Sequence, residues 1–521
     1  MKQLESKELP SSWGWASLDR LVEVNPKLDK SQYDDELEVS FVPMPAVEAE
    51  TGQIDVSETK KFSEVKKGYT AFQENDVLFA KITPCMENGK MAVVPSVRND
   101  LGFGSTEFHV LRSPGGISPQ YIYYYVSSKL FRIEAEHNMS GAVGQRRVPA
   151  PWLSSTELPV PPSKEQHRIV EKIEELFSEL DKGIESLKTA REQLKVYRQA
   201  LLKHAFEGKL TEEWRKENTD KLESADQLLE RIKKEREACY QQQLDKWQEA
   251  VRQWEADGKR GKKPRAPKKI NNDLEIIKLN TPREWLAINL GFATTLLGDG
   301  LHGTPKYDEG GEYHFINGNN LDNGKIVLKG NTKRVSEEEY NKYKKELNDK
   351  TVLVSINGTI GNTAFYNGEK VVLGKSACYF NLLPCVNKHY IRFLLTGVGF
   401  LNYALREATG STIKNVQLKA MRSFGFPLCS EPEQEKVVNL LEMHLSVLDK
   451  QESDIEVNLR LSETLRQAIL QKAFSGQLVP QNSNDEPASV LLERIAAEKV
   501  EAVAKQKKAP RKRRTKKELQ Q

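Results

Sequence analysis

Apolar residues recur at every seventh position in two stretches of the chain that are otherwise rich in Glu, Lys and Arg. These positions are Ile173, Leu180 and Leu187 in the first stretch, and Leu441, Leu448 and Ile455 in the second. A seven-residue spacing places side chains on one face of a helix, so each stretch is predicted to form a long helix with one buried stripe. The two stripes would bury each other in an antiparallel coiled coil. The alternative is that each helix packs on its own neighbouring domain.

The two stretches are copies of one sequence. EQHRIVEKIEELFSELDK at 165–182 returns as EQEKVVNLLEMHLSVLDK at 433–450, an offset of 268 positions (433 − 165). The offset holds without a gap to Leu210 and Leu478, and the copies end in RQALLKHAFEGKL and RQAILQKAFSGQL. An internal repeat of this kind predicts two equivalent helices.

Both copies carry signals for the start and the end of a helix. The predicted capping boxes are Ser163 with Gln166 and Ser430 with Glu433. Gly208 and Gly476 stand where the helices are expected to end. At 1.5 Å per residue, about 40 helical residues span roughly 60 Å, which is the length of a rod rather than of a core helix.

Two blocks of ordinary domain size lie between the helical parts and are distantly related to each other. The similar pairs are LPSSWGWASL near the start with TPREWLAINL at 281–290, NDVLFAKI (75–82) with KTVLVSIN (350–357), and MSGAVGQRRV (139–148) with ATGSTIKNV (408–416). Short Val, Ile and Phe runs separated by Gly and Asn predict mixed domains with a twisted sheet.

The predicted fold is therefore two α/β (α+β) domains that alternate with two long antiparallel coiled-coil helices, in an internal pseudo-twofold repeat. The predicted order is a first domain at 1–162, a helical spacer at 163–210, a charged helical extension and basic linker at 211–270, a second domain at 271–429, a second spacer at 430–478, and a helical extension with a basic C-terminal tail at 479–521.

The net charge of +4 conceals two strongly basic runs. Residues 258–269 carry seven Lys or Arg and residues 505–517 carry nine, in both cases without an acid. Each run follows a copy of LLERI, at 228–232 and at 491–495, so the repeated unit extends beyond the long helix. Such runs are usually solvated linkers or tails, but in a nucleic-acid-binding protein they add sequence-independent attraction to phosphate.

Other features of the composition exclude several classes of protein. The five cysteines have no spacing typical of a zinc site, so we expect no metal. No run of about 18 apolar residues occurs, and the chain begins with the polar MKQLESKELP. These features predict a cytoplasmic protein with no membrane partner.

The ordered repeat resembles the specificity subunit of type I restriction-modification systems over essentially the whole chain. The features that carry the resemblance are the two EQ helix starts, the two AFxGxL helix ends, and the diverged block ahead of each helix. The resemblance implies that each block is a target recognition domain that reads one half of a bipartite site in double-stranded DNA. It implies helices that set the gap and hold two methyltransferase (M) subunits and the restriction/translocase (R) subunits. S-adenosylmethionine, ATP and magnesium would belong to those partners, and no cofactor to this chain.

Candidate DNA-binding residues cluster in segments of both blocks that are rich in Gly and Asn. Asn, Gln and Arg are best suited to read base edges in the major groove, whereas Lys, Ser and Thr mostly hold phosphates. The same Asn-Gly pairs can simply form tight turns. The candidates are Lys81, Thr83, Asn88, Lys90, Gln145, Arg146 and Arg147 in the first block, and His302, Thr304, Lys306, Asn317, Asn319, Asn357, Thr359, Asn362, Ser411, Lys414 and Asn415 in the second.

Motifs for catalysis are missing from the sequence. No GxGxxG follows a predicted strand, and Asn25-Pro26 is followed by Lys27-Leu28 rather than by the Pro and aromatic residue of an adenine methyltransferase. GEKVVLGKS at 368–376 has five residues between its glycines where a P-loop needs four. We therefore expect no catalytic residues and no enzyme activity. The alternatives are a coiled-coil scaffold associated with DNA, or a fragment of a self-sufficient restriction-modification enzyme.

This lack of motifs gives the first prediction. Equilibrium dialysis of the purified chain against S-adenosylmethionine should detect no stoichiometric binding, because the sequence has no loop that could hold the methyl donor. Binding of one equivalent would contradict the assignment of catalysis to partner subunits.

Overall fold

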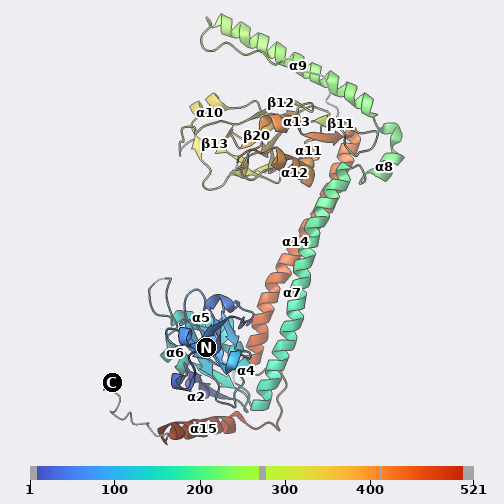
Figure 1. The fold of residues 1–521 in the computed structure, drawn as a ribbon. Coiled ribbons are helices and arrows are strands. Elements are labelled where there is room, and N and C mark those ends of the chain that lie inside the picture. Colours follow the sequence, from blue (N-terminus) through green and yellow to red (C-terminus); the bar gives the residue numbers. More distant parts are fainter. Residues whose placement is uncertain (1–8, 143, 269–276, 411–412, 509–521) are drawn as a thin grey trace. The chain divides into compact units, whose positions relative to one another are not determined.

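The computed structural model describes residues 9–142, 144–268, 277–410 and 413–508 (Figure 1). The chain forms two compact units. Unit 1 contains the residues up to 188 and those from 456 onward, and unit 2 contains residues 189–455. Each unit therefore holds one globular domain together with part of both long helices.

The two long helices have the predicted lengths. Helix α7 (Ser163–Phe206) and helix α14 (Glu431–Phe474) contain 44 residues each. Most positions of the predicted stripe are buried, whereas Leu180 and Leu187 are half-buried. The predicted seven-residue spacing thus describes the buried face of both helices.

The helices run antiparallel in each unit. In unit 1 the early residue Ile173 of α7 shares a buried cluster with the late residue Ile469 of α14. In unit 2 the late residue Leu201 of α7 shares a cluster with the early residue Leu441 of α14. The predicted antiparallel coiled coil is confirmed.

One ion pair between the helices is present in both units. In unit 2, Arg198 on α7 contacts Asp449 on α14 at 2.5 Å. In unit 1, Arg466 on α14 contacts Asp181 on α7. The two arginines and the two aspartates are each 268 positions apart (466 − 198 and 449 − 181), so the ion pair is part of the sequence repeat.

Both helices end near the predicted glycines. Gly208 and Gly476 have left-handed φ angles of 73° and 70°, which residues with a Cβ rarely adopt and which often follow a helix. A Cβ on Gly208 would lie 2.3 Å from Pro282, and one on Gly476 would lie 2.4 Å from Pro10. The glycine of each AFxGxL motif therefore also provides space for a proline of a globular domain.

The first globular domain contains two four-stranded sheets and a two-stranded ribbon. The sheets have the orders β2-β9-β6-β7 and β4-β3-β8-β5, and the parallel pair β3/β8 makes the second sheet mixed. The strands are β1 (Gly14–Ser17), β2 (Glu23–Val24), β3 (Glu38–Val42), β4 (Thr59–Lys61), β5 (Thr70–Phe72), β6 (Val77–Ala80), β7 (Met91–Val93), β8 (Gly102–Gly104), β9 (Phe108–Arg112) and β10 (Glu157–Val160). The helices are α2 (Leu18–Leu21), α3 (Phe62–Val65), α4 (Pro119–Ser127), α5 (Lys129–His137) and α6 (Ala150–Ser155).

The second domain repeats this plan with different details. Its main sheet has the order β12-β20-β17-β18, a second sheet has the order β16-β13-β19 with β13 and β19 parallel, and β14 pairs with β15. The strands are β11 (Leu286–Asn289), β12 (Thr294–Asp299), β13 (Tyr313–Ile316), β14 (Leu321–Asp322), β15 (Lys325–Ile326), β16 (Arg334–Val335), β17 (Thr351–Ser355), β18 (Thr363–Phe365), β19 (Val371–Leu373), β20 (Ala377–Leu382) and β21 (Gly425–Leu428). The helices are α10 (Glu337–Tyr343), α11 (Lys388–Thr396), α12 (Val398–Glu407) and α13 (Leu418–Ser423).

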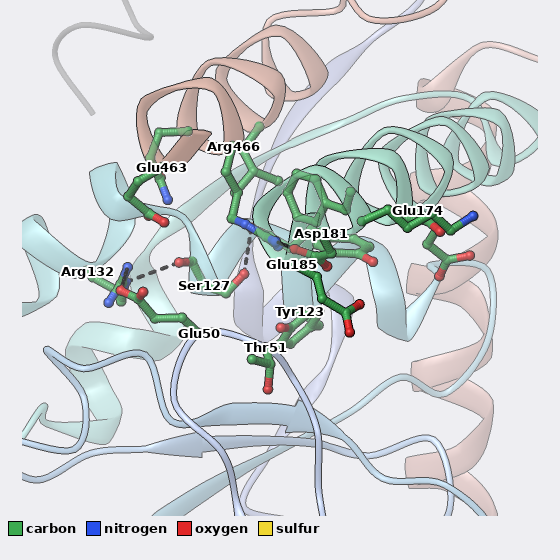
Figure 2. Close-up of a pocket in the computed structure, with 16 residues that line it drawn as sticks. Glu50, Thr51, Tyr123, Ser127, Arg132, Glu174, Asp181, Glu185, Glu463 and Arg466 are labelled. Atoms are coloured by element: carbon green, nitrogen blue, oxygen red, sulfur yellow. Dashed lines mark hydrogen bonds and ion pairs between the residues drawn. The ribbon is translucent and has the colours of Figure 1, made fainter. Parts of the chain in front are cut away.

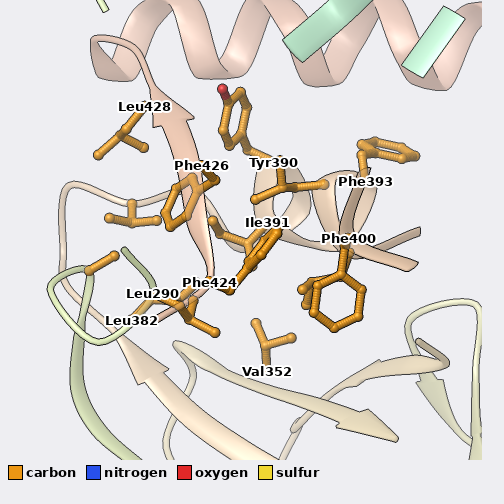
Figure 3. Packing of buried hydrophobic residues seen from close by; sticks show 14 of the residues in the cluster. Leu290, Val352, Leu382, Tyr390, Ile391, Phe393, Phe400, Phe424, Phe426 and Leu428 are labelled. Carbon is orange, nitrogen blue, oxygen red and sulfur yellow. The ribbon is translucent and has the colours of Figure 1, made fainter. Parts of the chain in front are cut away.

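The two domains share their core plan. The strands β6 and β17, which come from the similar segments NDVLFAKI and KTVLVSIN, are both inner strands of a four-stranded antiparallel sheet. In the second domain, Tyr390, Ile391 and Phe400 from α11 and α12 pack with Phe424 and Phe426 (Figure 3). The predicted α+β class of both domains is confirmed.

Further helices extend the repeat. Helix α8 (Glu212–Glu217) follows α7, and helix α9 (Ala225–Ala256) then packs on the second domain through the buried Leu228 and Ile232. Helix α15 (Ala488–Lys508) packs on the first domain through Leu491 and Ile495. These four residues come from the two LLERI copies. In the described residues, no helix is long and apolar enough to cross a membrane.

The glutamine of each EQ dipeptide joins a long helix to a globular domain. Gln166 accepts a hydrogen bond from the backbone N–H of Ser118 at 3.0 Å. Gln434 accepts one from the backbone N–H of Asn387 at 2.8 Å and donates to the carbonyl of Cys429. Ser118 and Asn387 are the N-cap residues of α4 and α11, so the same joint is built twice.

The predicted capping boxes are wrong. The side-chain oxygen of Gln166 accepts from the backbone N–H of Ser118 rather than from that of Ser163, and its amide group donates to the carbonyl of Pro161. In the described part of the chain, the hydroxyl of Ser430 is buried without a hydrogen-bond partner, and the carboxylate of Glu433 is used elsewhere. These side chains are buried between helix and domain, where Gln166 and Glu433 form tertiary hydrogen bonds instead of the capping bonds.

The glutamate of each EQ dipeptide is buried, but its partners differ between the units. Glu433 accepts hydrogen bonds from Thr211, from Arg215 at 2.8 Å and from the indole of Trp285 at 2.9 Å. Glu165 accepts one from Gln481, and burial raises the pKa of its carboxyl above the ordinary value. The residue 268 positions after Arg215 is a serine, so the Arg215 ion pair is not repeated in unit 1.

Aromatic contacts attach the far end of each helix to the other domain. Phe206 at the end of α7 contacts Tyr390 of the second domain, with ring centroids 5.1 Å apart. Phe474 at the end of α14 contacts Tyr121 of the first domain at 5.3 Å. Tyr121 and Tyr390 each donate a hydrogen bond to a proline carbonyl in the closing strand, β10 or β21. Each domain is therefore held by the start of one helix and the end of the other.

The difference between the two glutamates generates the second prediction. Glu433→Gln should lower the free energy of unfolding of unit 2 by about 3 kcal/mol, because the poorly exposed charge of Arg215 would lose its anionic partner. Glu165→Gln should leave the stability of unit 1 unchanged or raise it near neutral pH, because it removes a buried carboxylate that lacks a cationic partner. Urea unfolding followed by hydrogen-exchange mass spectrometry would measure each unit separately.

The pH dependence provides the control. The folded-state pKa of Glu165 is raised, so its contribution to stability is full below the unfolded-state pKa and is lost as pH rises through the folded-state pKa. Unit 1 should therefore lose this contribution between acidic and neutral pH, and Glu165→Gln should abolish the loss. Equal destabilisation by the two substitutions would contradict the proposed difference.

Candidate nucleic-acid interface

Two candidate loops of the first domain lie side by side. Arg147 forms isolated β-bridges with Ile82 and with Ser140. The backbone N–H of Thr83 donates to the carbonyl of Arg146 at 3.0 Å. The segment that follows β6 and the SGAVGQRR segment, which are far apart in the sequence, are therefore joined by backbone hydrogen bonds into one surface.

The second domain builds the same arrangement. Asn415 forms bridges with Asn357 and with Thr409. The backbone N–H of Gly358 donates to the carbonyl of Lys414 at 3.3 Å. The segment that follows β17 thus lies against residues 414–415 in the same way, although the side chains of the two domains differ.

Two further candidate segments of the second domain join this surface. The backbone of Ile356 donates to the carbonyl of Ser376, and the hydroxyl of Ser376 donates to the side chain of Asn317. Leu301, next to His302, pairs with Gly374. The loops that carry His302, Asn317, Asn357 and Asn415 therefore meet around residues 373–376.

Acidic side chains already bind the arginines of the first domain. Arg147 makes two hydrogen bonds to Glu107, at 2.9 and 2.8 Å, and Arg146 contacts Glu136 at 3.4 Å. The hydrogen bond with Arg147 lowers the pKa of Glu107 and raises the pKa of Arg147. A DNA phosphate or base would have to displace these carboxylates before it could bind either arginine. The side chain of Gln145 is exposed, so DNA could contact it without displacing a carboxylate.

The remaining candidates of the first domain differ in their hydrogen-bond partners and in their exposure to solvent. The ammonium of Lys90 donates to the carbonyls of Met44 and Val47, and the hydroxyl of Thr83 donates to Glu87. Burial lowers the pKa of Lys81, while Asn88 is exposed. Lys90 is thus engaged inside the domain, and Gln145 and Asn88 are the more accessible side chains.

The candidates of the second domain also include side chains that are exposed and side chains that form hydrogen bonds within the domain. The exposed side chains are those of His302, Thr304, Lys306, Asn319, Thr359 and Lys414. Asn357 donates to Asn415 at 3.4 Å, and the backbone of Asn362 bonds to Ser355. His302 is bonded to Asp299 at 2.5 Å. Ser411 lies outside the described residues.

Sequence reasoning missed two residues at these surfaces. Lys375 is exposed between β19 and β20, where the loops of the second domain meet. Glu107 holds Arg147 in the first domain. Lys375 belongs to GEKVVLGKS, and its Gly-Lys-Ser sequence is a signal that could have indicated a loop that binds DNA phosphate.

A pocket of about 430 Å³ in unit 1 lies where α4 meets the two long helices (Figure 2). Four of its charged side chains form two ion pairs. Arg466 contacts Asp181, and Arg132 contacts Glu50 and the carbonyl of Glu87. The pocket is a charged junction between domain and helices rather than a site with an activated nucleophile. Among the described residues, no group of His, Cys, Asp and Glu side chains could hold a metal ion.

Comparison with known proteins defines the class of the chain. Residues 10–189 and 302–458 match the family described as type I restriction modification DNA specificity domain. This match includes both sets of loops and the first part of each long helix. The chain therefore belongs to this family.

Individual relatives support the family assignment over shorter stretches. The chain is 42% identical over 175 residues to the type I restriction enzyme EcoAI specificity subunit of Escherichia coli, a stretch that is 33% of this chain and 29% of that protein. It is 26% identical over 410 residues to the EcoBI specificity subunit of E. coli, or 75% of this chain and 74% of that protein. The chain thus matches less than a third of the length of the EcoAI subunit.

Solved structures share the fold. A chain from the work described as "Structural basis underlying complex assembly and conformational transition of the type I R-M system" aligns with a TM-score of 0.65 at 18% identity, and covers 90% of this chain and 100% of that chain. The crystal structure of the HsdS subunit from Thermoanaerobacter tengcongensis aligns with a TM-score of 0.56 at 17% identity, and covers 91% and 99%. At these identities the likeness concerns the fold alone.

Proposed function

We propose that this chain is the DNA sequence-specificity subunit of a type I restriction-modification complex, and that each globular domain reads one half of a bipartite site in double-stranded DNA. The observation that carries the proposal is the pair of equivalent loop surfaces. In both domains the segment after the central strand lies against the loop that ends at Arg147 or Asn415. The backbone arrangement is the same while the side chains differ, as expected of two readers of different sequences.

The proposed partners follow from the same assignment. Two methyltransferase subunits would bind the repeated helical surfaces, and restriction/translocase subunits would join the complex. S-adenosylmethionine, ATP and magnesium would be bound by those subunits. This chain would contribute recognition and no catalytic step.

The third prediction tests the assignment of one domain to each half-site. Gln145→Ala should relax specificity in one half of the recognised sequence, and Lys414→Gln should affect the other half. A lost bidentate base contact costs roughly 1 to 3 kcal/mol at its own base pair, whereas a lost phosphate contact weakens binding without changing the preferred sequence. The sequences of DNA duplexes selected from a random library, with partner subunits supplied, would report both effects.

Controls are available in the same loops. Replacement of Arg146 or Arg147 by Gln should act on the same half as Gln145→Ala, and Asn415→Ala on the same half as Lys414→Gln. If changes in both domains altered the same half-site, the assignment of one domain per half would be wrong.

We propose further that α7 and α14 together set the number of unread base pairs between the half-sites. Both helices begin in one compact unit and end in the other. Equivalent ion pairs and buried stripes hold them in a defined register within each unit. A helix pair of this kind is stiff, whereas a flexible linker would allow many gaps.

The fourth prediction follows. Insertion of one heptad after Thr189 and another after Val457 should preserve the buried stripe, lengthen each helix by about 10 Å and widen the gap without changing the half-sites. Insertion of two residues at each point should rotate the stripe by about 200° and disrupt folding or assembly. The methylated sequence produced with partner subunits is the measurement. An active heptad variant that kept the original gap would show that the helices do not set it.

A further inference from the structure

A basic segment folds back along the last turns of α9 and is attached there by two tryptophans. The indole N–H of Trp247 donates to the carbonyl of Pro264 at 3.1 Å, and that of Trp254 donates to the carbonyl of Gly261 at 3.3 Å. The two tryptophans are seven positions apart, so they lie on one face of the helix. The segment therefore returns antiparallel to α9.

The return begins with a tight turn. Gly258, Lys259 and Gly261 have left-handed φ angles of 72°, 61° and 81°. The backbone N–H of Lys259 donates to the carbonyl of Trp254 at 2.8 Å, and the Lys259 ammonium lies 5.9 Å from the Trp254 ring centroid. The turn and the two indole contacts give the segment a defined path, unlike a freely solvated linker.

The charge of this segment faces water. Between residues 258 and 268 the chain has six cations and no acid, and all six are exposed: Lys259, Arg260, Lys262, Lys263, Arg265 and Lys268. None of them makes an ion pair within the part of the chain that the structure describes. The last turns of α9 carry the acids Asp245, Glu249 and Glu255 beside the cations Lys246 and Arg252, so the excess of positive charge comes from the returning segment.

We propose that this segment, with the helix turns that hold it, is a binding site for the sugar-phosphate backbone of double-stranded DNA outside the half-sites. The seven residues 262–268 that follow the turn span at most about 25 Å, and a partner must offer one sign of charge over a similar length. Duplex DNA carries one negative charge per about 1.7 Å of its axis, which an acidic protein surface rarely matches. Pro264 and Pro267 have no N–H group to donate to a phosphate, so the contacts would come from the charged side chains. Contacts to phosphate carry no sequence information.

The proposal rests on the function proposed above, and the experiment separates the two. The full chain is compared with a variant in which the six cations are replaced by Gln, and with a control that replaces six exposed lysines outside the long helices and the candidate loops: Lys27, Lys30, Lys61, Lys67, Lys129 and Lys216. Binding to a random-sequence duplex and to the recognised duplex is measured over a range of salt concentrations.

The segment variant should bind both duplexes more weakly at low salt. The magnitude of its slope of log affinity against log salt should be smaller by about 2 to 5, because each phosphate contact that is lost lowers this magnitude by about 0.9. The ratio of the two affinities should not change, and the control should keep the slope of the unmodified chain.

Three outcomes would overturn the proposal. They are an unchanged slope, an equal change in the control variant, and loss of partner-subunit binding with intact DNA binding, which would assign the segment to an acidic protein surface. If instead the unmodified chain with its partners failed to distinguish the two duplexes, the proposed recognition function would fail, while the salt slope would still report on the segment.

Discussion

The Glu-Gln pair at the start of each long helix is the contact on which the rest of the architecture depends. The glutamine binds the N-terminus of a domain helix, at Ser118 or Asn387, and the glutamate is buried beside it. A buried carboxylate or amide must be hydrogen-bonded, because an unpaired one costs several kcal/mol. The helix and the domain can therefore dock in one orientation only, in which these bonds form.

The need for these specific contacts explains why the two long helices are nearly identical in sequence while the candidate loops have diverged. Phe206 and Phe474, and Gly208 and Gly476, complete the joint by receiving an aromatic ring and a proline from the domain. These contacts need particular side chains, so the two helices are nearly identical. The candidate loops are held by backbone hydrogen bonds, such as that of Thr83 to Arg146. Backbone bonds do not depend on the side chain, so loop residues can vary while the surface keeps its shape.

The candidate surfaces of the two domains differ in whether their cationic side chains are paired with carboxylates. In the first domain Arg146 and Arg147 are paired with the carboxylates of Glu136 and Glu107. In the second domain Lys414 and Lys375 are exposed. The two surfaces should therefore differ in how much of their affinity depends on salt, because exposed cations release counterions on binding and paired arginines must first exchange partners.

The sequence alone determined the elements whose signal is periodic or repeated: the two antiparallel helices, their glycine ends, the two related domains and the pairs of similar segments. These features follow from local rules, since a seven-residue spacing or a glycine stop acts within a few residues. Only the tertiary structure decided that Ser430 and Glu433 do not form a capping box, that Lys90 is engaged by carbonyls, and that Glu107 binds Arg147. It also decided that Trp247 and Trp254 hold the basic segment. The physical reason is that a polar side chain takes whichever partner the fold brings within hydrogen-bonding distance, and that partner can be hundreds of residues away.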